Sequence, residues 1–110
     1  MAEKQFKVRM MAFMTEVGQD PVIRIVSVPE ADVERAGNIT NLLNTIYHNG
    51  QNDFQRQPDR CSVSVGDVIE IEDQLFIVKN LGFSKMSQEK FEEYGKIERR
   101  DRMIRMFGEY

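Results

Sequence analysis

The sequence has few of the side chains that catalytic and metal-binding sites most often use. Among its 110 residues there is one cysteine, Cys61, and one histidine, His48. A single cysteine excludes an internal disulfide and a cysteine-rich zinc site, and it is typical of proteins from a reducing compartment. We therefore expect a cytoplasmic protein that uses no cofactor.

Long apolar runs are also missing. No segment approaches the roughly 20 apolar residues that a membrane-spanning helix needs. The first residues, MAEKQFKVRM, lack the apolar core of a signal peptide. The sequence contains no internal repeat and no low-complexity tract. We expect neither export nor contact with a membrane.

An excess of positive charge is missing as well. The net charge is −3, so any nucleic-acid site must be a local feature of the surface. With 41% hydrophobic and 30% charged residues, the composition is that of a globular protein and is too apolar for a disordered one. A chain of 110 residues fits one domain, and we expect a single domain over residues 1–110.

A regular pattern of apolar residues is present in place of these features. Period-two alternation predicts a strand over residues 6–14 and a second over residues 22–28, joined by a turn. Two further alternating runs, Val63–Ile71 and Gln74–Lys79, lie on either side of the polar pair Glu72-Asp73. The pattern therefore predicts two antiparallel hairpins.

Helix signals lie between the two hairpins. Pro29, followed by acidic residues, predicts the start of a short helix, and Gly37-Asn38 predicts a break in it. The apolar spacing over Ile39–Tyr47 then predicts an amphipathic helix. Asn49-Gly50 is expected to end that helix, because both residues tolerate the left-handed conformation.

The C-terminal region predicts a charged helix over about residues 87–107, with Ser84 or Ser87 as its cap. This helix either packs on the core or protrudes. The polar segment 51–60 receives no assignment. Together the elements predict an α+β fold, a small antiparallel sheet of two hairpins packed against an amphipathic helix, with the charged helix at the C-terminus.

The order of these elements resembles that of a known family. The segment RCSVSVGDV, residues 60–68, follows the amphipathic helix, and a short hairpin then ends in Leu81-Gly82-Phe83. Over about residues 41–83 the chain resembles the YodL-like domain of small bacteriophage, plasmid and conjugative-element proteins. The resemblance implies a mobile element in a bacterial cytoplasm and a part in host takeover or counter-defence, and it implies no catalytic residue. Cys61 and the charged C-terminal helix depart from the family pattern.

The C-terminal helix also carries the strongest charge contrast in the chain. Residues 96–105 hold five basic and two acidic side chains, a net +3, so the rest of the chain carries −6. Arginine suits bidentate contacts with phosphate or carboxylate, and flexible methionine side chains suit an adaptable partner surface. A solvated helix face with ion pairs between neighbouring turns is the alternative. The predicted binding residues are Lys96, Arg99, Arg100, Arg102, Met103, Arg105 and Met106.

Three side chains elsewhere have the chemistry of a catalytic group. His48 with Asp53 and Asp59 is compatible with a base or a metal site, and Cys61 with a nucleophile. Each has a simpler interpretation, a solvated histidine at a helix end and a half-buried strand cysteine. Asp67 is best interpreted as a turn residue bonded to backbone N–H groups. We therefore expect no enzyme.

The predicted function is that of a non-enzymatic binding module. It is expected to engage a host protein through the C-terminal helix and the polar segment 51–60. The alternative is a small domain that binds RNA or DNA through the basic residues of the same helix, in a salt-dependent manner. The sequence leaves the oligomeric state open.

Overall fold

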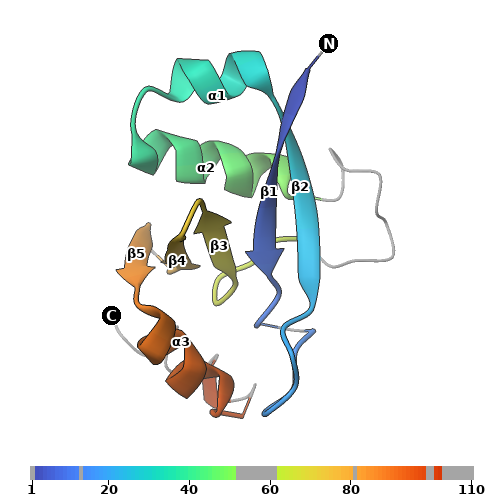
Figure 1. Cartoon of the computed structure of the whole chain (residues 1–110), viewed down its shortest axis with the longest axis vertical. Helices are drawn as coiled ribbons and strands as arrows, with labels where there is room; N and C mark the ends of the chain where they lie inside the picture. Colours follow the sequence, from blue (N-terminus) through green and yellow to red (C-terminus); the bar gives the residue numbers. More distant parts are fainter. Residues whose placement is uncertain (1, 13, 52–61, 81, 99–100, 103–110) are drawn as a thin grey trace.

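The computed structural model describes residues 2–12, 14–51, 62–80, 82–98 and 101–102, and within them it contains a five-stranded antiparallel sheet and three helices (Figure 1). The predicted α+β class is confirmed. The strand order is β2-β1-β3-β4-β5. None of the described helices has both the length and the apolar character needed to cross a membrane. The elements are β1 (Glu3–Arg9), β2 (Ile23–Pro29), α1 (Glu30–Ala36), α2 (Ile39–Asn49), β3 (Val68–Ile71), β4 (Gln74–Val78), β5 (Phe83–Met86) and α3 (Gln88–Gly95).

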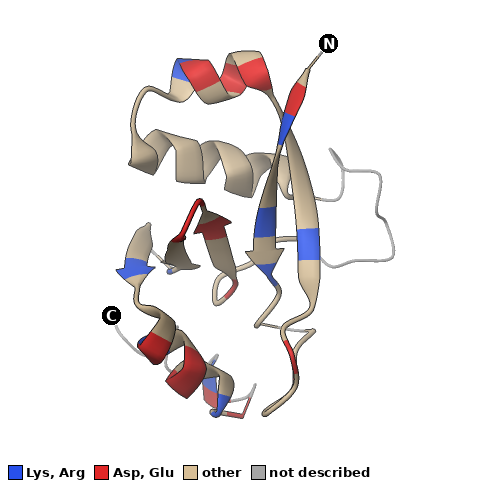
Figure 2. Ribbon diagram, viewed as in Figure 1, with Lys and Arg blue, Asp and Glu red and all other residues tan. Residues whose placement is uncertain are grey.

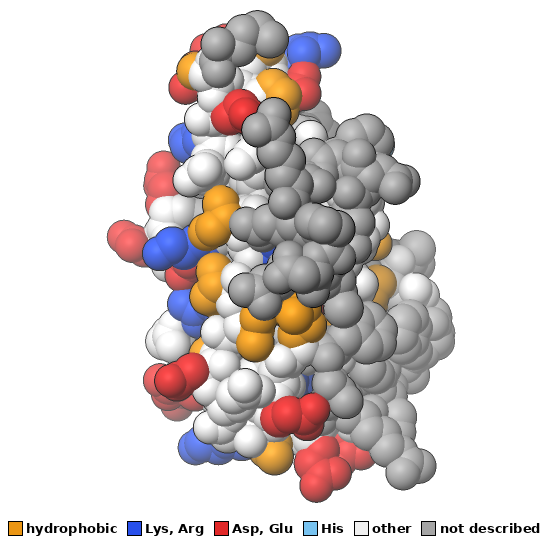
Figure 3. Space-filling view, turned by 90° about the vertical axis from the view of Figure 1, so that its right-hand side faces the viewer, with side chains coloured by type: hydrophobic (Ala, Val, Ile, Leu, Met, Phe, Trp, Pro, Cys, Tyr) orange, Lys and Arg blue, Asp and Glu red, His pale blue; other side chains and the backbone are white. Residues whose placement is uncertain are grey.

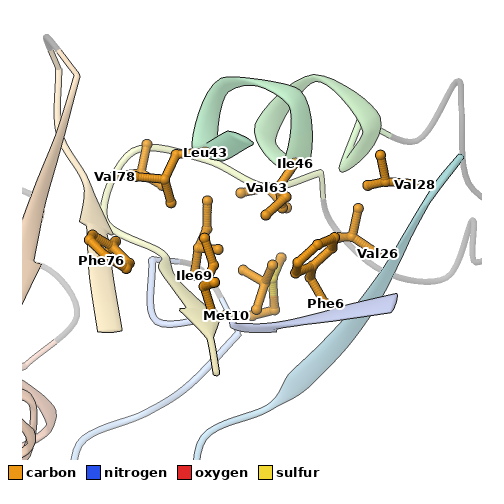
Figure 4. Close-up of a cluster of buried hydrophobic side chains, with 12 residues drawn as sticks. Phe6, Met10, Val26, Val28, Leu43, Ile46, Val63, Ile69, Phe76 and Val78 are labelled. Carbon is orange, nitrogen blue, oxygen red and sulfur yellow. The ribbon is translucent and has the colours of Figure 1, made fainter. Parts of the chain in front are cut away.

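One face of the sheet is covered by α1 and α2 (Figure 1). Alternate residues of the strands point to this face, where they meet Leu43 and Ile46 on the apolar side of α2. Figure 4 shows the resulting core between the sheet and the helix. The amphipathic helix therefore packs on the sheet as predicted. The core residues labelled in Figure 4 are Phe6, Met10, Val26, Val28, Leu43, Ile46, Val63, Ile69, Phe76 and Val78.

A second, smaller core lies on the opposite face, under α3. Phe91 and Tyr94 of this helix are buried against Val68 of β3 and against Leu75 and Ile77 of β4. Ser87 caps the helix by accepting a hydrogen bond from the Lys90 N–H (3.1 Å). The C-terminal helix therefore packs on the sheet over its described length, and it ends at Gly95.

The first strand is shorter than predicted. It ends at Arg9, whereas alternation predicted a strand over residues 6–14. The Met11 N–H donates to the Arg9 carbonyl (2.9 Å), which turns the chain, and the Thr15 hydroxyl bonds the Met10 carbonyl (2.9 Å). Met10, Met11 and Ala12 are apolar because they lie in a buried loop. The prediction was wrong because burial in a loop and burial in a strand select the same residue types.

The second hairpin also differs from its prediction. Its first strand begins at Val68, after a turn at Gly66-Asp67, although the apolar run begins at Val63. A fifth strand, β5, follows and pairs with β4 at the edge of the sheet. This strand was not predicted, because the four residues FSKM show no alternation of apolar and polar side chains.

Gly50 ends α2, but not for the predicted reason. Its φ is −76°, so the left-handed conformation is not used. A Cβ atom built at Gly50 would lie 2.4 Å from Cγ2 of Val63, and the Val63 N–H donates to the Gly50 carbonyl (3.1 Å). Glycine is therefore required because the chain leading to β3 passes directly over the end of α2.

Gly50→Ala is expected to lower the free energy of unfolding by about 1–3 kcal/mol, the usual cost of overpacking a core. Urea denaturation measures this change. In a Val63→Ala background the facing methyl groups are gone, so the same substitution should cost much less. An equal cost in both backgrounds would show that the contact with Val63 is not the reason for glycine.

Candidate interaction site

The predicted C-terminal binding cluster is only partly described by the structure. Lys96 is exposed at the end of α3. Arg102, by contrast, is fully buried. Its guanidinium donates to the carbonyls of Met11 (2.7 Å), Thr15 (2.9 Å) and Ile97 (2.7 Å). Its prediction as a surface ligand was therefore wrong. Arg99, Arg100, Met103, Arg105 and Met106 lie outside the described residues.

Because Arg102 is buried, it cannot contact RNA or DNA at the surface, which weakens the prediction of a nucleic-acid-binding domain. Figure 3 shows Lys and Arg side chains interspersed with Asp and Glu on the face that it displays. The described residues on this face therefore form no stripe of positive charge of the kind that follows a phosphate backbone. Binding of RNA or DNA stays a prediction for Lys96, Arg99, Arg100 and Arg105.

Of the residues proposed for a reaction centre around His48, the structure describes only His48 itself. His48 is exposed on α2, where it lines a shallow groove of about 470 Å³ with Asn44 and Asn49. Asp53, Asp59 and Cys61 lie outside the described residues. Within the described part of the chain, no three His, Cys, Asp or Glu side chains are arranged to hold a metal ion.

Asp67 has the structural role that the sequence suggested. Its carboxylate is buried and accepts hydrogen bonds from the N–H groups of Ala12 (2.9 Å) and Ser64 (2.8 Å). Burial raises the pKa of this carboxyl to about 6, although the backbone N–H groups act in the opposite direction. Tyr94 donates to the neighbouring Gly66 carbonyl (2.6 Å), and burial raises the pKa of its hydroxyl. Asp67 and Arg102 thus hold the loop after β1 from two sides.

An accessible site arises elsewhere, from the unequal lengths of β1 and β3. All of β1 pairs with β2, but on its other side only Lys7, Val8 and Arg9 pair with β3. The β3–β4 hairpin turns away at Glu72, whose φ is +55°. Among the described residues, no strand therefore pairs with the opposite edge of β1 at Glu3–Phe6.

Hydrogen bonding shows which backbone groups face this gap. The Met10 N–H donates to the Val22 carbonyl (2.8 Å), and the Glu30 N–H donates to the Ala2 carbonyl (3.3 Å). Bonded and non-bonded pairs alternate along an antiparallel ladder, so the even-numbered residues of β1 bond to β2. The odd-numbered residues Glu3 and Gln5 direct their N–H and C=O groups into the gap. Within the described chain these groups meet no partner strand.

Side chains make the gap a groove of about 460 Å³, here called the notch. Its apolar part is formed by Phe6, Leu42 and Ile71. Lysines of β1 line one side of it, and acidic residues of the hairpin line the other. Figure 2 shows basic residues along β1 and acidic residues at the β3–β4 turn. The notch is defined by Lys4, Gln5, Phe6, Lys7, Leu42, Glu70, Ile71, Glu72 and Asp73.

The charges of the notch are mostly available to a partner. Glu70 is paired with Arg9 (2.8 Å), and the Arg9 guanidinium also lies over the Phe91 ring, 4.4 Å from its centre. The other ion pair of the described residues, Asp32 with Arg35, lies on α1. Lys4 lies 5.8 Å from the centre of the Phe6 ring. This site was not predicted, since its only signals in the sequence are the polar stretch before Phe6 and the acidic turn.

Comparison with known proteins adds no further constraint. No protein-family model matches the sequence, and no curated protein or solved structure matches it either. The resemblance to the YodL-like domain stays a prediction that rests on residues 41–83. The geometry of the notch is therefore the feature of the described chain that bears most directly on function.

Proposed function

We propose that the protein is a non-enzymatic binding module that contacts another protein through the notch. The observation that carries the proposal is the open backbone edge of Glu3 and Gln5 beside an apolar floor. Natural proteins usually protect such an edge, because exposed strand edges pair readily with other chains. A strand edge that stays accessible between charged side chains is typical of a site that recognises another polypeptide.

The mobile-element setting and the identity of the partner as a host protein stay predictions from the family resemblance. The environment of Asp67 supports a binding role over a catalytic one, because its carboxyl is occupied in holding the backbone. This carboxyl, the most buried acidic group described, is held by backbone N–H groups and turned away from solvent. The notch itself offers lysines and carboxylates on opposite walls, which suits charge-complementary contact with a protein surface.

The proposal is tested by affinity capture from a bacterial lysate with two charge-reversed variants. Lys4→Glu with Lys7→Glu changes the notch. Lys85→Glu with Lys90→Glu changes the net charge equally at exposed positions on β5 and α3. We expect the notch variant to recover at least about tenfold less of the specific partner, because like charges placed in an interface cost several kcal/mol. The β5 and α3 variant should recover the partner as the wild type does.

Two results would contradict the proposal. In one, the wild type and the notch variant recover the same proteins in the same amounts. In the other, the control variant alone loses the partner, which would place the contact on the side of the molecule formed by β5 and α3. Circular dichroism of both variants shows whether they are folded, and only folded variants enter the comparison.

A further inference from the structure

We infer that the notch binds an extended segment of its partner as an added β-strand, paired with Glu3–Gln5 of β1. This inference rests on the proposed function and specifies how the contact is made. β3 pairs with β1 as far as Lys7, and the chain leaves this line at Glu72. The space beyond, opposite Gln5, is the continuation of the line that β3 occupies. A strand placed there extends an existing ladder.

The backbone supplies the directional part of the contact. Gln5 and Glu3 each present one N–H and one C=O toward the notch, at the spacing of a β-ladder. Because β3 runs antiparallel to β1, a segment that continues its direction also pairs antiparallel. Antiparallel pairing is the more stable arrangement. Its first residues then lie beside the Glu72-Asp73 turn.

The side chains of the notch define the chemistry of the segment. A residue opposite Lys4 faces the same side of the sheet as Lys4 and Phe6, because side chains alternate along a strand. An acidic residue at that position pairs with Lys4 across the strands. The register of β1 and β3 places Ile71 opposite Phe6, so the residue two positions earlier cannot continue the ladder. It leaves the sheet beside Glu72 and Asp73 and is favoured when it is basic. The expected pattern is a basic residue, any residue, then an acidic residue.

A second copy of the chain is a poorer occupant than such a segment. The same edge of another copy must pair without meeting Ile71, which the register of β1 and β3 places opposite Phe6. A register that keeps Ala2 of the second copy clear of Ile71 places Glu3 of one copy opposite Glu3 of the other. Like charges directly opposite each other destabilise a strand pair. Charge therefore favours a partner that carries the complementary pattern.

The first test selects short random linear peptides, displayed as a library, on the immobilised full chain. We expect the selected peptides to contain the basic, any, acidic pattern and to bind at the notch. Amide hydrogen exchange of the wild type then reports the pairing directly. Peptide is expected to slow exchange at the Gln5 N–H by about tenfold or more, while the Lys4 N–H, already bonded to β2, changes little.

The second test compares three variants with the strongest selected peptide. Gln5→Pro removes an N–H that faces the notch and leaves the bonds to β2 intact, since edge positions tolerate proline. Gln5→Ala keeps the N–H. Lys85→Pro is the matched control, because the bond from Lys79 N–H to the Gly82 carbonyl (2.9 Å) sets a ladder in which the Lys85 N–H points away from β4. Gln5→Pro is expected to weaken binding about tenfold or more, and the other two less than about threefold.

Strand addition is overturned if Gln5→Pro binds the peptide as the wild type does, or if Lys85→Pro alone loses binding. It is also overturned if no peptide is selected, or if the Gln5 amide gains no protection. In these cases capture of a protein through Lys4 and Lys7 still stands, so the proposed function is tested separately. A concentration-dependent dimer that Gln5→Pro abolishes would identify a second copy as the occupant and would equally overturn the inference.

Discussion

Arg102→Ala is expected to lower the free energy of unfolding by about 3–5 kcal/mol, because it removes a buried charged group that satisfies several backbone carbonyls. The Arg102 side chain is fully buried and donates to the carbonyls of Met11, Thr15 and Ile97. It also lies over the Tyr94 ring, 5.6 Å from its centre. Alanine leaves these carbonyls in a buried site without their donor. Urea denaturation followed by circular dichroism measures the loss.

Two further variants separate the role of Arg102 from a general effect of charge. Arg35→Ala removes an exposed arginine that pairs with Asp32 on the surface of α1, and it should cost no more than about 0.5 kcal/mol. Arg102→Lys keeps the charge but lacks the planar fork that reaches three carbonyls, so it should recover only part of the stability. If Arg102→Ala is no more destabilising than Arg35→Ala, the structural role of Arg102 is contradicted.

The sequence could not have revealed the role of Arg102. In sequence it belongs to a run of basic residues, which is typical of an exposed helix face. Two of its acceptors are main-chain carbonyls that lie 91 and 87 residues away. A carbonyl group is present at every residue and therefore leaves no mark in the pattern of side chains. Only the path of the loop after β1 brings these groups together.

Local signals were sufficient for much of the fold. Gly37 ends α1 with a φ of +77°, and Asn38 caps α2 by accepting a hydrogen bond from the Asn41 N–H (2.8 Å). Both features follow from residue type alone, because few residues adopt that conformation or make that bond. Asp67, interpreted as a turn residue, was correct for the same reason. Prediction succeeded where a neighbouring residue determines the structure.

The notch could not be predicted, because it depends on the difference in length between β1 and β3, which are distant in the sequence. The start of β1 at Glu3 lies in a polar stretch, where alternation is weak. The end of β3 is set by the turn at Glu72, which carries a positive φ without being glycine. Such a residue costs about 1 kcal/mol or more and is found mainly where surrounding structure or function requires it. The length mismatch becomes visible only when the two strands are aligned.

Asp67 is expected to make stability depend on pH in a window between about 4 and 6. An unfolded aspartate has the ordinary pKa of 3.8, whereas burial raises the pKa of Asp67 to about 6 in the folded protein. Between these values the folded state holds a proton that the unfolded state has released. The free energy of unfolding therefore decreases as the pH rises through the window, by up to about 3 kcal/mol for this group.

The measurement is the difference in unfolding free energy between the wild type and Asp67→Asn, taken from urea denaturation at a series of pH values. Other groups titrate in both proteins, so their contributions largely cancel in the difference. Asparagine is neutral, as the protonated carboxyl is, and its carbonyl oxygen can accept from only one of the two N–H groups of Ala12 and Ser64. The bond lost at the other N–H has a cost that does not depend on pH, so it offsets the difference without changing its slope. The advantage of the wild type over Asp67→Asn should therefore be greatest near pH 4 and should decline toward pH 7. An advantage that grows with pH would mean that the backbone hydrogen bonds outweigh burial, and that the folded carboxyl ionises below its ordinary range.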